Sequence, residues 1–249
     1  MVDEGRKRTG RASKDERRWP VVEASAMAWI DTEQMIEVDR VMIEDLHIEL
    51  IQMMENAGHH LARLTRDLVF PEAAAVYVGS GGNAGGGLVA ARHLSNLGVE
   101  VTVVAGRHAD ELGPVQRHQL DIVERMGIAV VSDPVDADVA VDALIGYSLA
   151  GAPRGRTGEL VAHLARSDQP VIALDVPSGL DTTTGATPGP VVNAVATLTL
   201  ALPKRGLVDR TEVGRLFVAD ISVPPALYRS MGLTSPAPPF ELGPILEVR

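Results

Sequence analysis

Three side chains that can take part in proton transfer come close behind apolar runs of the sequence. Asp142 and Asp175 each follow such a run directly, and Lys204 comes soon after a third. A carboxylate beside an ammonium forms a general acid/base pair whose proton affinities burial can tune. If the three runs are parallel strands of one sheet, their carboxyl ends lie along one edge, where such sheets bind ligands. We therefore expect Asp142, Asp175 and Lys204 to lie near one another.

The same edge carries oxygen atoms that suit a metal ion. Ser178 follows Asp175 closely, and Asn83 lies in a glycine-rich stretch. Asn, Asp and Ser oxygens with few charges suit a hard monovalent cation, whereas no histidine cluster supports a transition metal. Each residue also has a structural explanation on its own, because an Asp after a strand often caps a turn and Pro177-Ser178 is ordinary turn chemistry. Their joint placement is what favours a site.

The glycine-rich stretch, residues 79–87, has the composition of a phosphate-binding loop. Six of its nine residues are glycine, and the apolar run 73–78 before it predicts a buried strand. The spacing of Leu88, Ala91 and Leu94 predicts a helix that begins near Leu88. Glycine lets the backbone approach an anion closely, and a helix N-terminus offers free N–H groups and a favourable dipole. A flexible turn between strand and helix is the alternative.

Two familiar kinds of nucleotide site are disfavoured. No Gly-Lys-Ser/Thr follows the glycines, which argues against a P-loop hydrolase. No acidic residue closes the apolar run 101–104, where an ordinary NAD enzyme places its ribose-binding carboxylate; Gly106-Arg107-His108 stands there instead. The stretch therefore predicts a phosphate site without conventional hydride chemistry.

Composition limits the class of protein. The 249 residues suit one large α/β domain, and 45% hydrophobic residues with 3% aromatic ones predict a core of aliphatic side chains. A net charge of −10 argues against general affinity for nucleic acid or anionic membranes. Zero cysteines exclude disulfides, thiol nucleophiles and cysteine-ligated metals. Without a secretory signal or an apolar run of about 20 residues, the expected location is the cytoplasm.

The elements that must position these residues can be followed along the chain. Residues 1–18 carry seven Lys/Arg and four Asp/Glu without apolar periodicity, which predicts a disordered basic tail before a single domain over residues 19–249. The tail could contact RNA or a partner, but a solvated tail is favoured. At the other end, Pro236, Pro238 and Pro239 predict a surface strap.

Two helices are expected before the glycine-rich stretch. Asp31 or Thr32 can cap the first, whose expected buried face is Met35, Val38, Met42 and Leu46. The apolar positions of the second are Met54, Ala57, Leu61, Leu64 and Leu68. This second helix contains Asn56-Ala57-Gly58, although Asn and Gly are poor helix formers. Either Gly58 allows close helix packing, or Asn56 reaches a ligand or supports the glycine-rich stretch.

Strands and helices then alternate. The apolar runs are 76–78, 101–105, 128–131, 138–145, 171–176, 196–202 and 216–218, and the helical patterns are 86–97, 114–126 and 157–166. This alternation predicts an α/β fold with a mostly parallel sheet covered on both faces and right-handed crossovers.

At this point the chain resembles a known family, the YjeF N-terminal domains, which are NAD(P)H-hydrate epimerases. The resemblance covers about residues 28–225 and rests on six ordered motifs: Thr32-Glu-Gln-Met35 with Asp39, Met54-Glu-Asn-Ala-Gly58, Gly87-Leu-Val-Ala-Ala-Arg-His-Leu94, Asp142-Ala-Leu-Ile-Gly146, Asp175-Val-Pro-Ser-Gly-Leu-Asp181, and Leu202-Pro-Lys204 followed by Val218-Ala-Asp-Ile221. It implies a Rossmann-like three-layer α/β/α fold, a homodimer, and interconversion of the R and S epimers of hydrated NADH or NADPH.

Matched by position, the resemblance also implies a role for each candidate residue. Asn83, Asp142 and Ser178 fall where the family holds K⁺. Asp175 falls where it binds the hydrated nicotinamide and acts as acid/base, and Lys204 falls beside it. The implied substrate-binding residues are Asn56, Gly81, Gly82, Asn83, Ala84, Gly85, Gly86, Gly146, Tyr147, Ser148, Leu149, Arg154 and Asp175. A separate ADP- or ATP-dependent dehydratase would act on the product.

The chain departs from the family pattern at three positions. The family's loop reads Asn-Asn-Gly-Gly-Asp-Gly, so that Gly82 and Gly86 replace an Asn and an Asp, and Tyr147 replaces a small residue of the second loop. Backbone donors survive, but two polar side chains do not. Two alternatives therefore stay open: a non-catalytic nucleotide-binding or scaffold module of the same fold, and an enzyme on a different nucleotide-like substrate.

Overall fold

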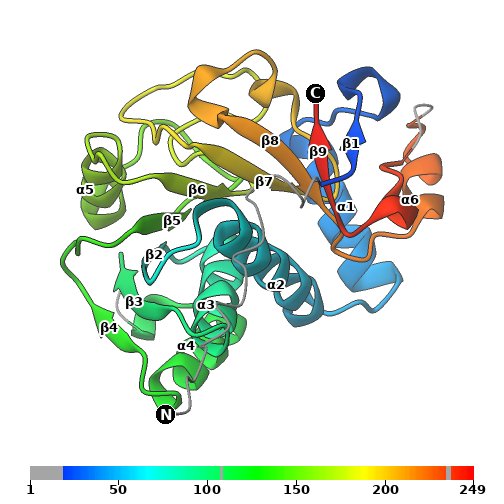
Figure 1. The fold of residues 1–249 in the computed structure, drawn as a ribbon. Helices are drawn as coiled ribbons and strands as arrows, with labels where there is room; N and C mark the ends of the chain where they lie inside the picture. Colours follow the sequence, from blue (N-terminus) through cyan, green and yellow to red (C-terminus); the bar gives the residue numbers. More distant parts are fainter. Residues whose placement is uncertain (1–18, 107–108, 234–236) are drawn as a thin grey trace, which may run out of the picture.

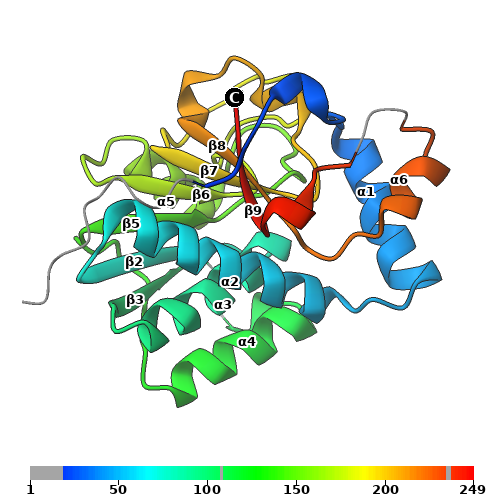
Figure 2. The ribbon, with the colours of Figure 1, turned by 45° about the vertical axis from the view of Figure 1, so that its right-hand side comes forward.

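The chain folds as layers of helices on the two faces of one twisted sheet (Figures 1 and 2). The structure, a computed structural model, describes residues 19–106, 109–233 and 237–249. The predicted basic tail at residues 1–18 lies outside the described residues, as does Pro236. The three-layer α/β fold expected from the alternating pattern is confirmed.

The sheet has nine strands within the described residues. They are β1 (Val21–Val22), β2 (Ala73–Val78), β3 (Glu100–Ala105), β4 (Ala129–Val131), β5 (Val139–Ala143), β6 (Val171–Leu174), β7 (Ala196–Leu200), β8 (Arg215–Ala219) and β9 (Ile245–Val248). Their order is β1-β9-β8-β7-β6-β5-β2-β3-β4, and β2 to β8 are all parallel.

The strand order places a ligand crevice between β2 and β5. From β2 the chain winds outward through β3 and β4, then returns to the other side of β2 with β5 and winds the opposite way. At such a switch point the two following loops diverge and leave a crevice at the carboxyl ends of the strands. The glycine-rich stretch leaves β2 and the second glycine-bearing loop leaves β5, so both lie at this crevice.

The helices cover both faces of the sheet. They are α1 (Thr32–Arg40), α2 (Leu50–Val69), α3 (Gly82–Asn96), α4 (Pro114–Arg125), α5 (Gly155–Leu164) and α6 (Pro225–Ser230). Helices α2, α3 and α4 lie together on one face (Figure 2), and α5 lies on the other. Along β2 the side chains alternate between these layers: Val76 and Val78 belong to the core under α2 and α3, whereas Tyr77 belongs to the core under α5.

Helix α1 begins at the expected cap, but its end departs from the regular α-helical pattern that was predicted. Asp31 caps it, because its carboxylate accepts the Gln34 N–H at 2.9 Å while the Gln34 side chain accepts the Asp31 N–H at 3.1 Å. A π-helical turn, η2 (Val41–Asp45), follows and changes the register. Met42 stays buried, but Leu46 is 44% exposed, so its expected place on the buried face is wrong.

Most of the glycine-rich stretch is helical, and only residues 79–81 form a loop. Helix α3 begins at Gly82, six residues before the predicted start near Leu88. A Cβ at Gly85 would lie 2.2 Å from Met54 Sδ, and one at Gly87 would lie 2.5 Å from Ala143 Cβ. These glycines let the helix run flush against α2 and the sheet. Close packing therefore overrides the low helix propensity of glycine.

The structure supports the interpretation that Gly58 allows close packing of two helices. A Cβ at this position of α2 would lie 2.4 Å from both Gly86 O and Val89 Cβ of α3. The two helices therefore meet backbone to backbone, glycine against glycine.

The end of the chain is part of the sheet rather than a surface strap alone. Pro238 and Pro239 precede a short 3₁₀ turn, η6 (Phe240–Leu242), and β9 follows as a buried strand. It pairs antiparallel with β8 and parallel with β1. The short strands β1 and β9 lie outside the seven apolar runs from which strands were predicted.

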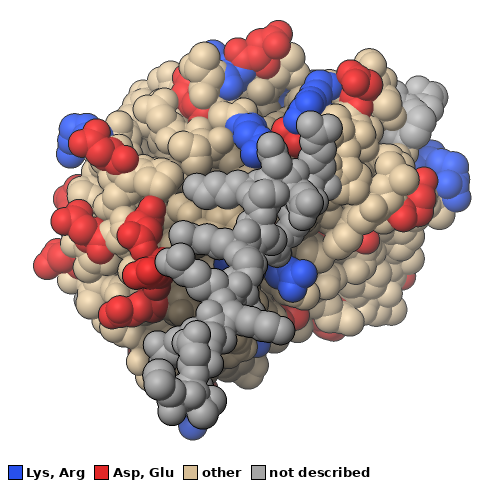
Figure 3. Space-filling view, in the orientation of Figure 1, with Lys and Arg blue, Asp and Glu red and all other residues tan. Residues whose placement is uncertain are grey.

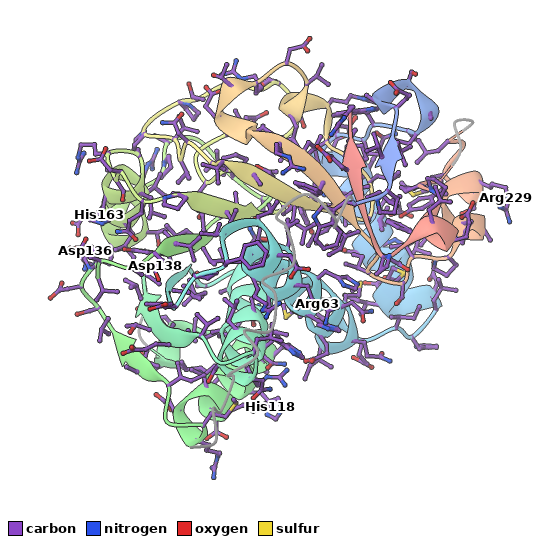
Figure 4. The ribbon with its side chains drawn as sticks, viewed as in Figure 1. Arg63, His118, Asp136, Asp138, His163 and Arg229 are labelled. Carbon is purple, nitrogen blue, oxygen red and sulfur yellow. The ribbon has the colours of Figure 1, made fainter. Side chains whose placement is uncertain are left out.

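The edge of the sheet opposite the crevice is acidic. Asp136, Asp138 and His163 lie together there, at the left of Figure 4, and acidic side chains gather along the same margin in Figure 3. Asp138 has a structural role, since one of its oxygens accepts the Glu72 and Ala73 N–H groups at 2.8 and 2.9 Å and fixes the start of β2.

Gly58→Ala tests the close approach of α2 and α3. The added Cβ must displace the α3 backbone, and overpacking of this kind costs about 1–3 kcal/mol, which we expect as a loss of unfolding free energy in urea. Gly82→Ala is the matched control, because a Cβ there meets nothing within 4 Å. It should change stability by no more than about 0.5 kcal/mol. Equal stability of the two variants would contradict the packing argument.

Candidate functional site

A cavity of about 440 Å³ opens at the crevice between β2 and β5. Its walls come from α1, α2, the N-terminal turn of α3, the ends of β6 and β7, and the segment 144–154 that follows β5. Ten of the residues predicted to bind substrate line it: Gly81, Gly82, Asn83, Gly86, Gly146, Tyr147, Ser148, Leu149, Arg154 and Asp175. The sheet edge expected from the sequence is therefore where the cavity lies.

Asp175 and Lys204 form a buried ion pair at the floor of this cavity. Lys204 Nζ donates to Asp175 Oδ1 at 2.5 Å, to Leu200 O at 2.8 Å and to Thr199 Oγ1 at 3.2 Å. Lys204 is fully buried and Asp175 is 1% exposed, yet Asp175 lines the cavity and Lys204 does not. The carboxylate therefore faces a ligand while the ammonium, with all three protons bonded, holds it from behind.

Two similar turns bring this pair together. Asp175 (φ 66°) and Ala201 (φ 64°) both adopt left-handed backbone just after β6 and β7. Each is followed by a tight bond, from Val176 N to Leu174 O at 2.8 Å and from Leu202 N to Leu200 O at 2.7 Å. Such a conformation is uncommon for residues other than glycine and marks functional sites where the neighbouring structure enforces it.

Asp142 and Ser178 form a second buried polar pair behind the cavity wall. Ser178 donates to Asp142 through its hydroxyl at 2.6 Å and through its N–H at 2.8 Å, and Leu144 N–H donates at 3.2 Å. Both residues are 0% exposed. Burial raises the pKa of Asp142 to about 6, although these hydrogen bonds oppose the shift. The pair joins the loops after β5 and β6.

Asn83 lies in the first turn of α3 and lines the cavity. Its Nδ2 donates to Leu174 O at 2.8 Å. A Cβ at Gly146 would come within 2.6 Å of Asn83 Oδ1, so the amide oxygen lies against the backbone of the second loop. Among the described residues no donor to this oxygen is recorded. It is available to a ligand.

Two helix N-termini border the cavity. Gly81 is the N-cap of α3, and Cβ atoms at Gly81 and Gly82 would meet nothing within 4 Å. Arg154 is the N-cap of α5 and lines the same cavity. Free N–H groups at two helix starts, with an arginine beside one, suit a ligand with phosphate groups.

Asp39 and Tyr147 are a third polar pair at the cavity, and the role of Asp39 was not anticipated. Tyr147 OH donates to Asp39 Oδ2 at 2.5 Å, across 108 positions of the chain. Burial raises the pKa of Asp39, and burial with the Asp39 charge raises the pKa of the Tyr147 hydroxyl. Two signals were present in the sequence: Asp39 stands four residues after Met35, within the apolar face of α1, and it belongs to the first of the family motifs.

Three predicted residues are not brought to the cavity. Ala84 and Gly85 are buried inside the first turns of α3. Asn56 lies on a side of α2 turned away from its cavity-lining stripe, and its Nδ2 donates to Ser222 Oγ at 2.8 Å beside a separate hollow. Asn56 therefore does not reach into the cavity in this structure, and its recorded hydrogen bond is to Ser222 rather than to the glycine-rich stretch.

Comparisons with known proteins agree on one family. Residues 50–206 match the family model described as YjeF-related protein N-terminus. The NAD(P)H-hydrate epimerase of Dehalogenimonas lykanthroporepellens is 43% identical over 235 residues, 91% of this chain and 95% of that protein. The NAD(P)H-hydrate epimerase of Truepera radiovictrix is 38% identical over 188 residues, 74% of this chain and 86% of that protein.

Longer relatives and a solved structure extend the comparison. The bifunctional NAD(P)H-hydrate repair enzyme of Hyperthermus butylicus is 41% identical over 194 residues, 73% of this chain but 36% of that longer protein. The crystal structure of a yeast protein superposes with a TM-score of 0.78 at 21% identity, over 89% of this chain and 100% of the yeast chain. This likeness shows the fold. Within the described residues, no helix has the length and apolarity required to cross a bilayer.

The buried Asp142 makes stability depend on pH in a defined window. Its pKa is 3.8 in the unfolded chain and about 6 in the folded one, so the folded state binds the extra proton between these values. Stability from this group is present at low pH and falls as pH rises through 6, by about 3 kcal/mol at about 1.4 kcal/mol per pKa unit. We expect the wild-type unfolding free energy, minus that of Asp142→Asn, to fall by most of this amount, about 2 kcal/mol, from pH 4 to pH 7.

The measurement is urea unfolding at several pH values in buffer free of K⁺. Asp121→Asn is the matched control, because Arg125 lowers the pKa of the exposed Asp121 carboxyl and its effect has the opposite sign. A flat difference between wild type and Asp142→Asn would show that Asp142 titrates normally in the folded protein.

Proposed function

The chain belongs to the family of YjeF-related proteins, in their N-terminal domain, and we propose that it is an NAD(P)H-hydrate epimerase, an isomerase that interconverts the R and S epimers of hydrated NADH and NADPH. The observation that carries this proposal is the cavity-facing Asp175, held by the buried Lys204. The similarity to epimerases over most of the chain supports it.

The chemistry needed is cleavage and re-formation of the C–O bond at one carbon, with proton transfer to and from the oxygen. In the hydrated nicotinamide this carbon bears a hydroxyl and is bonded to the ring nitrogen. A protonated acid that donates to the hydroxyl lets water leave while the nitrogen lone pair forms a C=N bond. Return of water to the other face, with loss of a proton to a base, completes the inversion. Asp175 can serve as this acid/base, a role worth about 10²–10⁴ in rate.

Lys204 positions Asp175 rather than reacting itself. Its three donors are all taken, and it has no surface in the cavity. The ammonium fixes Oδ1 of the carboxylate, and the Tyr147 N–H fixes Oδ2 at 3.1 Å. A carboxylate held at both oxygens keeps its orientation toward the reacting carbon, as preorganised catalysis requires.

The remaining cavity residues suit the dinucleotide. Free N–H groups at the starts of α3 and α5 suit its phosphates, with Arg154 beside them. The departures at Gly82 and Gly86 remove side chains but not backbone donors. Gly82 leaves open space at the phosphate end. We therefore assign the site to turnover rather than to a scaffold.

We propose further that K⁺ binds between α3 and the loops after β5 and β6. The Asn83 amide oxygen, the Asp142 carboxylate and the Ser178 hydroxyl are all oxygen donors with one formal negative charge among them, a set that suits a hard monovalent cation. The free Asn83 Oδ1 against Gly146 supports this assignment. When bound, the cation would supply a fixed positive charge near the phosphates.

A partner reaction follows from the relatives. Several are bifunctional repair enzymes in which the region similar to this chain is less than half of the protein. We propose that the S epimer made here is consumed by a separate dehydratase that uses ADP or ATP. A homodimer and a cytoplasmic location stay predictions.

The proposed activity is tested with R-NADHX. A dehydratase specific for the S epimer first removes all S-NADHX from an epimer mixture, and the full-length chain is then added. We expect hydrate loss to resume well above the spontaneous rate, and Asp175→Asn to reduce this by about 100-fold or more, because the acid/base group is lost.

Asp181→Asn is the matched control, because Asp181 lies after the same strand but bonds its own turn through Thr184. It should retain most of the activity. No acceleration by the folded wild-type chain, or full activity in Asp175→Asn, would contradict the assignment.

Removal of K⁺ tests the cation site. Replacing K⁺ by tetramethylammonium, which is too large for the site, should lower activity, and titrating K⁺ back should restore it. Asn83→Ala removes one donor and should raise the K⁺ concentration needed for half-maximal activity. Identical titration curves for wild type and Asn83→Ala would exclude Asn83 as a ligand.

A further inference from the structure

A second carboxylate, Asp39, lines the cavity from a different direction than Asp175. Asp39 belongs to α1, which lies beside α6 in Figure 2, whereas Asp175 follows β6 on the sheet edge. Neither carboxylate contacts the other among the recorded hydrogen bonds. The reaction as described above uses only Asp175.

Tyr147 links the two carboxylates. Its N–H donates to Asp175 Oδ2 at 3.1 Å, and its hydroxyl donates to Asp39 Oδ2 at 2.5 Å. Its carbonyl accepts the Thr182 hydroxyl at 3.2 Å, which fixes the residue at a third point. The two carboxylates are therefore held apart by the length of one tyrosine, and both face the same cavity.

The surroundings of Asp39 allow it to carry a proton. Burial raises its pKa, and the nearby charge of Asp175 raises it further. The Tyr147 hydroxyl and the Lys204 ammonium lower it. These are the titratable groups that face Asp39 from the loops after β5, β6 and β7; the residues of α2 at the cavity, Leu50, Met53, Met54 and Ala57, are apolar.

Inversion at one carbon requires proton transfer on both faces of the ring, which a single fixed carboxylate does not reach. The hydroxyl leaves from one face of the ring, and water must arrive on the other face. A carboxylate bonded at both oxygens, as Asp175 is, cannot swing between faces. A second acid/base group on the other side removes this difficulty.

Resting on the proposed epimerase activity, we propose that Asp39 is a second catalytic acid/base residue, which serves the ring face opposite to the one that Asp175 serves. In one direction protonated Asp39 donates its proton to the substrate hydroxyl. The C–O bond breaks, water leaves, and the ring nitrogen lone pair forms the C=N bond. A water on the other face then forms the new C–O bond and gives its proton to the Asp175 carboxylate.

The steps balance without any redox partner. One water leaves and one water adds, and one proton moves from Asp39 to Asp175. Exchange with solvent resets the two carboxylates, and the reverse direction uses them in exchanged roles. Tyr147 is a positioning residue here, because its hydroxyl orients Asp39 and its N–H orients Asp175.

The test uses isotope exchange as well as inversion. With one carboxylate removed, the other can still expel and return water on its own face. Asp39→Asn should therefore lose about 100-fold or more in epimerisation while one epimer still exchanges its hydroxyl oxygen with H₂¹⁸O above the uncatalysed rate. Asp175→Asn should show the same pattern with the other epimer. Mass spectrometry of R-NADHX and S-NADHX incubated separately reads out both.

Glu37→Gln is the matched control. Glu37 is on the same helix, two residues away, and pairs with Arg40 outside the cavity. It should epimerise and exchange like the wild type. Thermal unfolding of each variant shows whether it is folded before it is assayed.

Tyr147→Phe gives a readout that a purely structural role would not move. The variant keeps the ring and the N–H to Asp175 but loses the hydroxyl that lowers the pKa of Asp39. Loss of this hydroxyl raises the pKa of Asp39. The apparent pKa that Asp39 contributes to the pH profile of kcat/KM should therefore move to higher pH.

The outcomes separate the two hypotheses. Opposite epimer preferences of exchange in Asp39→Asn and Asp175→Asn support the proposal. Two results would overturn it while the epimerase assignment stands. The first is near wild-type epimerisation in Asp39→Asn. The second is that Asp39→Asn loses inversion and exchange equally for both epimers while the pH profile of Tyr147→Phe does not move. An inactive wild-type chain overturns the epimerase assignment itself.

Discussion

The buried ion pair of Asp175 and Lys204 is the constraint on which the site depends. Taking both charges out of water costs several kcal/mol for each ion unless the remaining donors and acceptors are satisfied. The structure satisfies them with Thr199, Leu200 and the Tyr147 N–H. This requires left-handed backbone after β6 and β7. It also requires a bridge between Lys204 and Ile30, whose N–H and carbonyl bond the neighbouring backbone at 3.0 and 2.8 Å. The chain before α1 is thereby tied to the Asp175–Lys204 pair.

The glycines serve packing first, and the ligand site follows from the packing. Gly79 allows the end of β2 to approach β5, since a Cβ there would lie 2.1 Å from Leu144 O. Gly58 and Gly86 bring α2 and α3 into contact, and α3 can then begin at Gly82, more than one turn closer to the crevice than Leu88. The free N–H groups at the start of α3 consequently face the cavity instead of solvent. A helix that began near Leu88 would leave this end of the crevice to a loop without a fixed set of donors.

The sequence predicted features that depend on neighbouring residues, and it did not predict features that depend on contacts between distant parts of the chain. The alternation of strands and helices, and the edge that carries Asp142, Asp175 and Lys204, follow from apolar runs, because each strand end can be recognised separately. The start of α3 could not be predicted, since propensity opposes a helix there and only contacts with α2 favour it. The partner of Asp39 could not be predicted either, since Tyr147 stands 108 residues away. Both omissions are tertiary contacts that override a local rule.

Asp142 and Asp175 show why residue type and strand position alone do not assign a role. Asp142 lies in the last part of β5 and Asp175 directly follows β6, so both lie at the same edge of the sheet, and both are almost completely buried. Asp142 meets only neutral donors, so burial dominates and raises its pKa. Asp175 meets an ammonium and keeps an open side toward the cavity. The difference comes from the partners that the neighbouring loops supply, Ser178 in one case and Lys204 in the other. The buried contacts of Asp142 join two loops, whereas Asp175 presents a carboxylate to the cavity, and this difference supports the acid/base role that we propose for Asp175.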